Sequence, residues 1–216
     1  MKANRASRRV RGLYGVTPDA ADTSSLVALV GAAVAGGMRL VQYRNKLAAP
    51  ELRLEQARAL KTVCARHGAL MIVNDDVGVA RAVDADGVHL GREDSSAADA
   101  RQALGPEKLI GISCYNSLEL ARSAQTSGAD YVAFGSFFPS RVKPGAVCAS
   151  VVLLKQAKRE LAVPIVAIGG ITVANASQLI GAGANAVAVI SALFAAPDVA
   201  SAAAQFESLF DAPGET

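Results

Sequence analysis

The chain has 216 residues, of which 51% are hydrophobic and 19% are charged, and its formal net charge is +3 at pH 7. This length fits one domain with one sizeable core, and the lack of an unbroken apolar run of about 18 residues argues against a membrane span. The small positive charge does not require a polyanionic partner, and no zinc-finger, RNP or helix-turn-helix pattern indicates nucleic-acid binding.

The first 11 residues are basic but contain neither an apolar segment nor a small-residue cleavage site. We predict a poorly ordered basic tail over residues 1–11 and a single catalytic domain over residues 12–216; nucleic-acid contact by the tail is the less favoured alternative. The three cysteines are odd in number and lack CxxC spacing, which argues against a disulfide framework or a zinc site. We therefore expect a soluble protein of the reducing cytoplasm, and we leave its oligomeric state open, a homo-oligomer included.

Short β-branched segments alternate with alanine-rich helical segments along the rest of the chain. The predicted strands are Leu13–Val16, Arg39–Tyr43, Leu70–Val73, Gly87–Leu90, Leu109–Ser113, Tyr131–Phe134, Ile165–Ile168 and Ala186–Ile190. The segment Pro50–Arg66 has the amphipathic pattern of an outer helix, and His67-Gly68 is a typical helix end. Eight such units predict an α/β fold, a single-domain (βα)8 TIM barrel.

Polar residues gather directly after the predicted strands, where barrels of this kind place their chemistry. In chain order they are Gln42 to Lys46, Asn74 to Asp76, Gly91 to Asp94, Ser113, Gly135 to Gly145, Gly169-Gly170 and Ile190-Ser191. Because the carboxyl ends of all the strands meet at one rim, the sequence predicts one site there.

Gln42, Arg44 and Lys46 alternate along an extended segment, so their side chains point the same way. Two cations and an amide on one face suit phosphate oxygens, although an ordinary solvated strand end can carry the same residues.

Asp75 and Asp94 follow neighbouring strands, and two carboxylates that face one gap would repel each other without a cation. Magnesium prefers a few carboxylates together with phosphate oxygens and water, so this pair predicts a Mg²⁺ site completed by a diphosphate. The alternative is that one aspartate caps the following helix, a role that Asp76 fits better than Asp75 does.

Gly169-Gly170 and Ile190-Ser191 each precede a predicted helix, and the backbone N–H groups at a helix start can bind a phosphate monoester. A glycine pair alone can also be an ordinary turn. We expect His67 to be exposed and structural, and His89 to be a hydrogen-bonded histidine inside the barrel rather than a catalytic one.

In combination these segments resemble the thiamine-phosphate synthase family over about residues 12 to 210. The motifs that carry the resemblance are VQYRNK, IVNDD, ADGVHLGRED, GIS, GSFFPSRVKPGA, AIGGIT and VAVIS. The family joins hydroxymethylpyrimidine diphosphate to a thiazole phosphate and releases pyrophosphate.

The resemblance also implies roles for individual residues. It implies that the pyrimidine diphosphate is bound by Gln42, Arg44, Lys46, Asn74, Ser113 and Lys143, of which Arg44, Lys46, Ser113 and Lys143 are implied to be catalytic. It implies Mg²⁺ on Asp75 and Asp94, and a thiazole phosphate held by Ser140, Arg141, Val142, Gly170, Ile190 and Ser191. The implied partners are phosphorylated small molecules.

This chain departs from the family pattern at three places. Val142 stands where a second hydroxyl is common, Arg92 replaces a usual glutamine, and Tyr115 stands where a histidine often follows the serine. A thiazole tautomerase would need that histidine and has no need of a diphosphate grip. A sugar-phosphate isomerase or epimerase would need a base pair for proton transfer, which is not evident. A non-catalytic sensor of phosphorylated ligands is the alternative from outside enzymes.

Overall fold

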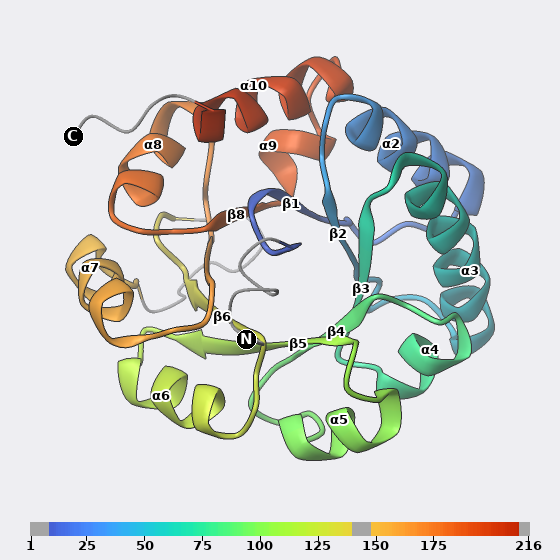
Figure 1. The fold of residues 1–216 in the computed structure, drawn as a ribbon. Coiled ribbons are helices and arrows are strands. Elements are labelled where there is room, and N and C mark those ends of the chain that lie inside the picture. Colours follow the sequence, from blue (N-terminus) through green and yellow to red (C-terminus); the bar gives the residue numbers. More distant parts are fainter. Residues whose placement is uncertain (1–8, 140–147, 212–216) are drawn as a thin grey trace.

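The computed structural model of the protein describes residues 9–139 and 148–211. Within them, eight parallel strands close a barrel in the order β1 to β8, with β1 paired to both β2 and β8 (Figure 1). The strands are β1 Gly12–Val16, β2 Leu40–Tyr43, β3 Leu70–Asn74, β4 Gly87–Leu90, β5 Leu109–Tyr115, β6 Tyr131–Gly135, β7 Ile165–Ile168 and β8 Ala186–Val189. The (βα)8 barrel predicted from the sequence is thereby confirmed.

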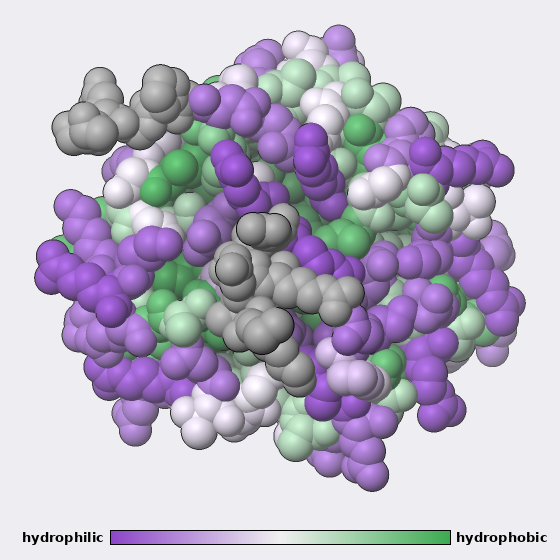
Figure 2. All heavy atoms as spheres, in the orientation of Figure 1, coloured by the Kyte–Doolittle hydropathy of each residue, from purple (hydrophilic) through white to green (hydrophobic). Residues whose placement is uncertain are grey.

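Helices surround the barrel in the described part of the chain (Figure 1). They are α2 Thr23–Ala35, α3 Pro50–His67, α4 Val77–Ala82, α5 Ala97–Leu104, α6 Leu118–Thr126, α7 Val151–Glu160, α8 Val173–Gly181, α9 Ser191–Phe194 and α10 Val199–Asp211. None of these helices is long and apolar enough to cross a membrane. The outward-facing surface of the helices is mostly hydrophilic (Figure 2), as expected of helices whose apolar faces pack on the sheet.

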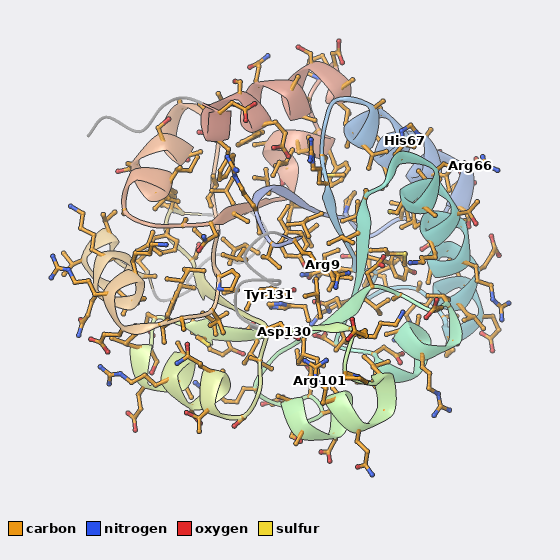
Figure 3. All side chains as sticks on the ribbon, in the orientation of Figure 1. Arg9, Arg66, His67, Arg101, Asp130 and Tyr131 are labelled. Carbon is orange, nitrogen blue, oxygen red and sulfur yellow. The ribbon has the colours of Figure 1, made fainter. Side chains whose placement is uncertain are left out.

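Helix α3 shows how the local sequence sets element boundaries. Pro50 occupies its first turn, where the missing N–H costs no hydrogen bond. Gly68 ends it with a φ of 68°, a left-handed conformation that suits glycine. His67 and Arg66 are exposed at this end of α3, away from the barrel centre (Figure 3), as expected for His67.

Inward-facing residues of alternate positions fill the barrel. This interior cluster consists of Val10, Tyr14, Val16, Leu40, Ile72, Leu109, Tyr131, Ala133, Val166, Ala186 and Ala188. Val10 is fully buried in the cluster, and the Arg9 guanidinium donates to the Glu107 carbonyl at 3.2 Å. The chain thus already contributes to the barrel interior at Val10, within the stretch predicted as a tail; residues 1–8 of that stretch lie outside the described residues.

An ion pair fastens the outer layer to the sheet on the side of β5 and β6. Arg101 of α5 pairs with Asp130, which directly precedes β6 (Figure 3). The same carboxylate accepts a hydrogen bond from the Ile110 N–H at 2.8 Å, so one aspartate joins α5, β5 and β6. Next to it, Tyr131 turns toward the barrel centre (Figure 3).

Gly111 makes room for that phenol. A Cβ atom added at Gly111 would lie 2.0 Å from Cζ of Tyr131, far inside van der Waals contact. We expect Gly111→Ala to lower the free energy of unfolding by about 1–3 kcal/mol, the range for overpacking a core.

Urea denaturation checks this, with Gly31→Ala as the control. Gly31 lies within α2, and a Cβ there meets nothing within 4 Å. Alanine at Gly31 should therefore stabilise the protein by up to about 1 kcal/mol. Equal stability of Gly111→Ala and the parent would contradict the steric argument.

Candidate active site

Two cations follow β2, and each is held by a carboxylate. The Arg44 guanidinium pairs with Asp19 at 3.2 Å, and the Lys46 ammonium lies 3.4 Å from a carboxylate oxygen of Asp75. Asp19 also accepts a hydrogen bond from the Lys46 backbone N–H at 2.6 Å. Asp19 was not among the predicted site residues, although it follows β1 and the same strand-end rule applies to it.

The backbone that carries these cations is pinned by Thr17. The Arg44 N–H donates to the Thr17 hydroxyl at 2.9 Å, and that hydroxyl donates to the Arg44 carbonyl at 2.9 Å. Asn45, on the opposite face of the segment, is buried and donates to the Ala20 carbonyl at 2.6 Å and to Gln56 at 2.9 Å. Thr17 and Asn45 therefore anchor the backbone that carries the two cations.

Asp75 and Asp94 lie within hydrogen-bonding reach of each other. Burial, followed by the neighbouring Asp94 carboxylate, raises the pKa of Asp75 above its ordinary value. Asp94 accepts a hydrogen bond from the Gly91 N–H at 2.6 Å, which fixes its carboxylate at the rim.

These two residues fit a magnesium ion. The repulsion that raises the pKa of Asp75 is relieved when a cation lies between the carboxylates. The described residues contain no group of three or more histidine, cysteine or acidic side chains placed to hold a metal. A two-carboxylate site that leaves positions for phosphate oxygens and water is the arrangement Mg²⁺ favours.

The neighbouring Asp76 has the capping role assigned to it from sequence. Its carboxylate accepts a hydrogen bond from the Val79 N–H at 2.8 Å at the start of α4. Asn74 ends β3 and pairs in register with His89 of β4. Asn74 therefore lies at the rim, between the cations after β2 and Asp94 after β4.

A series of hydrogen bonds, buried except at its Ser113 end, crosses the barrel beneath the rim. The Gln42 amide donates to the Tyr14 hydroxyl at 3.0 Å, and the Tyr14 and Tyr131 hydroxyls lie 2.8 Å apart. The Tyr131 hydroxyl is 3.1 Å from Nδ1 of His89, and Nε2 of His89 is 2.9 Å from the Ser113 hydroxyl. The series links two predicted site residues, Gln42 and Ser113, through three residues that had no predicted role in the site.

Burial determines the protonation states of the three ring side chains in this hydrogen-bond series. It lowers the pKa of His89 to about 4, so the imidazole is neutral near pH 7. It raises the pKa of both Tyr14 and Tyr131, so both phenols keep their protons. His89 is the hydrogen-bonded barrel histidine predicted from sequence. Its link to Ser113 was missed, although the alternation of β4 and β5 places both side chains inward.

The loops after β7 and β8 form the other end of the site. Gly170 has a φ of 62°, and its carbonyl accepts from the Asn175 amide at 3.1 Å. Thr172 is the N-cap residue of α8 and Ile190 is that of α9, and the first backbone N–H groups of an α-helix have no acceptor within the helix itself. This arrangement can bind a phosphate monoester.

The loop after β6 packs over Gly170, where a Cβ would lie 2.5 Å from the Pro139 carbonyl oxygen. The predicted site residues Ser140, Arg141, Val142 and Lys143 follow directly and lie outside the described residues. At the end of β5, the strand next to β6, the Arg92 guanidinium lies over the Tyr115 ring, 5.1 Å from its centroid. Two of the departures from the family pattern therefore contact each other.

Comparison with known proteins agrees with this geometry. Residues 13–193 match the family model described as thiamine monophosphate synthase. The chain is 56% identical to the thiamine-phosphate synthase of Thiobacillus denitrificans over 204 residues, which cover 94% of this chain and 97% of that protein. It is 56% identical to the thiamine-phosphate synthase of Nitrosospira multiformis, over 94% of this chain and 87% of that protein.

A solved structure is similar over nearly the same range. The thiamine phosphate pyrophosphorylase from Pyrococcus furiosus superposes with a TM-score of 0.84 at 35% identity, covering 94% of this chain and 97% of that one. The resemblance inferred from the rim motifs is confirmed: the chain belongs to the thiamine monophosphate synthase family.

Proposed function

We propose that the protein condenses hydroxymethylpyrimidine diphosphate with a thiazole phosphate to give thiamine phosphate and pyrophosphate. The observation that carries the proposal is the meeting of Arg44, Lys46, Asp75 and Asp94 at one rim, joined by the Lys46–Asp75 ion pair. Cations beside a carboxylate pair suit a magnesium diphosphate, and neither a tautomerase nor an isomerase needs such a group.

The proposed reaction is a dissociative substitution. The bond between the pyrimidine methylene carbon and the diphosphate oxygen breaks, and its electron pair leaves with the oxygen. The thiazole nitrogen then forms the new bond with its lone pair. No proton transfer is required, so the protein acts by stabilising charge on the leaving group and by aligning the nucleophile.

In this proposal Arg44 and Lys46 bind the diphosphate, and Lys143, which lies outside the described residues, adds a third cation by its place in the motif. Asp75 and Asp94 would hold Mg²⁺, which supplies positive charge for the departing oxygens. Gln42, Asn74 and Ser113 would orient the pyrimidine. Asp19, which was not among the predicted site residues, places one further negative charge beside Arg44. The net charge of the site with substrate bound is therefore more negative than the predicted residues alone would give.

For the second substrate, Gly170, Ile190 and Ser191 would receive the phosphate through backbone N–H groups. The segment Ser140 to Val142, outside the described residues, would complete this subsite by its place in the motif.

Pyrophosphate release on mixing both substrates with Mg²⁺ tests the proposal. Thiamine phosphate should accumulate in step with pyrophosphate, measured by its fluorescence after oxidation, and a chelator should abolish both. Substrate binding without release would indicate a sensor. Conversion of the thiazole alone, without the pyrimidine, would indicate a tautomerase; Tyr115 of this chain stands where that reaction would need a histidine.

A further inference from the structure

We propose that the series from Gln42 to Ser113 is a one-way hydrogen-bond relay that holds His89 in its Nε2–H tautomer and turns the Ser113 hydroxyl proton toward the substrate. The inference rests on the proposed function. It assigns Tyr14, Tyr131 and His89 as positioning residues that orient the hydrogen-bonding groups of Gln42 and Ser113 toward the heterocycle of the substrate.

The direction of the relay starts at Gln42. The Gln42 side-chain nitrogen can only donate, so the Tyr14 oxygen accepts at 3.0 Å. Tyr14 is 1% exposed, and its own proton needs an acceptor inside the barrel. The Tyr131 oxygen, 2.8 Å away, is that acceptor.

The remaining steps follow from this one. Because the Tyr131 oxygen accepts from Tyr14, its own proton is directed to Nδ1 of His89 at 3.1 Å. A neutral imidazole whose Nδ1 accepts carries its proton on Nε2. That N–H donates to the Ser113 oxygen at 2.9 Å, and the Ser113 proton is left to donate outward.

The opposite direction is disfavoured. If Tyr131 donated to Tyr14, the Tyr14 oxygen would accept from both neighbours, and its buried proton would have no acceptor among its hydrogen-bond partners in the described structure. A buried donor without a partner is costly, whereas the forward direction leaves every proton of the chain paired or facing the mouth.

The two ends of the relay then have fixed and opposite hydrogen-bonding roles toward the substrate. Gln42 uses its nitrogen inward, which leaves its side-chain oxygen as an acceptor, and Ser113 presents a donor from β5. An aromatic ring that turns an amino group toward Gln42 and an unprotonated ring nitrogen toward Ser113 matches this pair; a carbonyl facing Gln42 or a ring N–H facing Ser113 does not. A neutral His89 also keeps positive charge away from a ring that becomes cationic.

The relay also explains why position 111 is a glycine. The Tyr131 ring occupies the space above it, where any side chain would displace the phenol from its place between Tyr14 and His89. The edge-to-face packing of the Tyr14 and Tyr131 rings, with centroids 6.1 Å apart, and the stacking of His89 on Tyr131 at 5.5 Å hold the three rings in line.

Nitrogen-15 NMR of histidine-labelled protein tests the relay without any substrate. The chain has two histidines, so His67→Gln leaves His89 as the sole source of imidazole resonances. Near neutral pH we expect a protonated Nε2 and an unprotonated Nδ1. We also expect Tyr131→Phe, which removes the donor to Nδ1, to give a mixture of tautomers. A parent His89 with its proton on Nδ1 would overturn the proposal.

Kinetics provide the second readout. His89→Leu removes both hydrogen bonds and should lower kcat/KM for the pyrimidine diphosphate by about 10- to 100-fold, the scale for losing an orienting partner, while KM for the thiazole phosphate stays unchanged. His89→Gln retains a donor and should recover part of the loss, and the exposed His67→Gln should match the parent.

A parent-like kcat/KM for a folded His89→Leu would contradict the positioning role, and Tyr14→Phe provides the same kinetic test if that variant does not fold. The two hypotheses fail separately. An inactive parent with the expected tautomer refutes the proposed function, whereas an active parent with the Nδ1 tautomer refutes the relay.

Discussion

Asparagine in place of Asp94 is expected to lower turnover at low millimolar Mg²⁺ by about 10²-fold, on the scale for losing a charge that stabilises the transition state. The variant leaves Asp75 as the sole proposed carboxylate ligand, so saturation should require more Mg²⁺. The measurement is the magnesium dependence of pyrophosphate release, together with direct titration of Mn²⁺ as a spectroscopic substitute.

The control is Glu119→Gln, which removes one negative charge from the exposed face of α6. It should leave the magnesium dependence unchanged. If Asp94→Asn had the same magnesium dependence as the parent, Asp94 would not be a metal ligand.

Asp94→Asn should also stabilise the metal-free protein. It removes the negative charge of Asp94, which after burial is a cause of the raised pKa of Asp75. A carboxylate whose pKa is higher in the folded state favours folding at low pH, and this contribution is lost as the pH rises through the folded-state pKa. Asp94→Asn should therefore raise the melting temperature near pH 7 and have no such effect at a pH where Asp75 is protonated. The Asp75 side chain is 34% exposed, so we expect a gain of only about 2 °C.

Methionine in place of Arg44 should lower kcat/KM for the pyrimidine diphosphate by about 10²-fold or more, because Arg44 is proposed to donate to the departing diphosphate. Its side chain is 18% exposed and its guanidinium is paired with Asp19, so the group is positioned before substrate arrives. Arg44→Lys keeps the charge but loses the planar set of donors, and we expect it to recover only part of the activity.

Calorimetric titration of magnesium pyrophosphate separates this role from a structural one. Arg44→Met should bind the product more weakly, whereas the thiazole phosphate should bind as it does to the parent. Asp19→Asn should loosen Arg44 and have a smaller effect in the same direction. Unchanged pyrophosphate affinity in folded Arg44→Met would exclude Arg44 from the diphosphate subsite.

The fold was predictable because each strand carries its own local evidence. Ile165–Ile168 and Gly87–Leu90 are short, mostly apolar runs bounded by turns, and the structure gives both with the predicted bounds. The predicted strands Leu109–Ser113 and Ala186–Ile190 differ from β5 and β8 only at their ends, where pairing with a neighbouring strand decides the boundary.

The position of Asp75 and Asp94 at the rim was predictable for the same reason, since they follow β3 and β4 in the chain. What the sequence did not reveal depends on contacts between distant segments. Asp19 becomes notable only once it is seen beside Arg44, and the partners of His89 come from β5 and β6. No local pattern encodes which of the inward residues of separate strands touch, because strand stagger and the room left by Gly111 decide it.

The phenols and the imidazole in the middle of the barrel have a practical consequence for engineering. Selectivity in barrel enzymes is commonly altered by exchanging loops, but here the atoms that would read the heterocycle are oriented from below, by the strands. Loops of this chain grafted onto a relative with an aliphatic barrel interior would transfer the loop contacts but lose the orientation of the serine. Successful grafts should therefore carry the inward residues of β1, β4 and β6 with them.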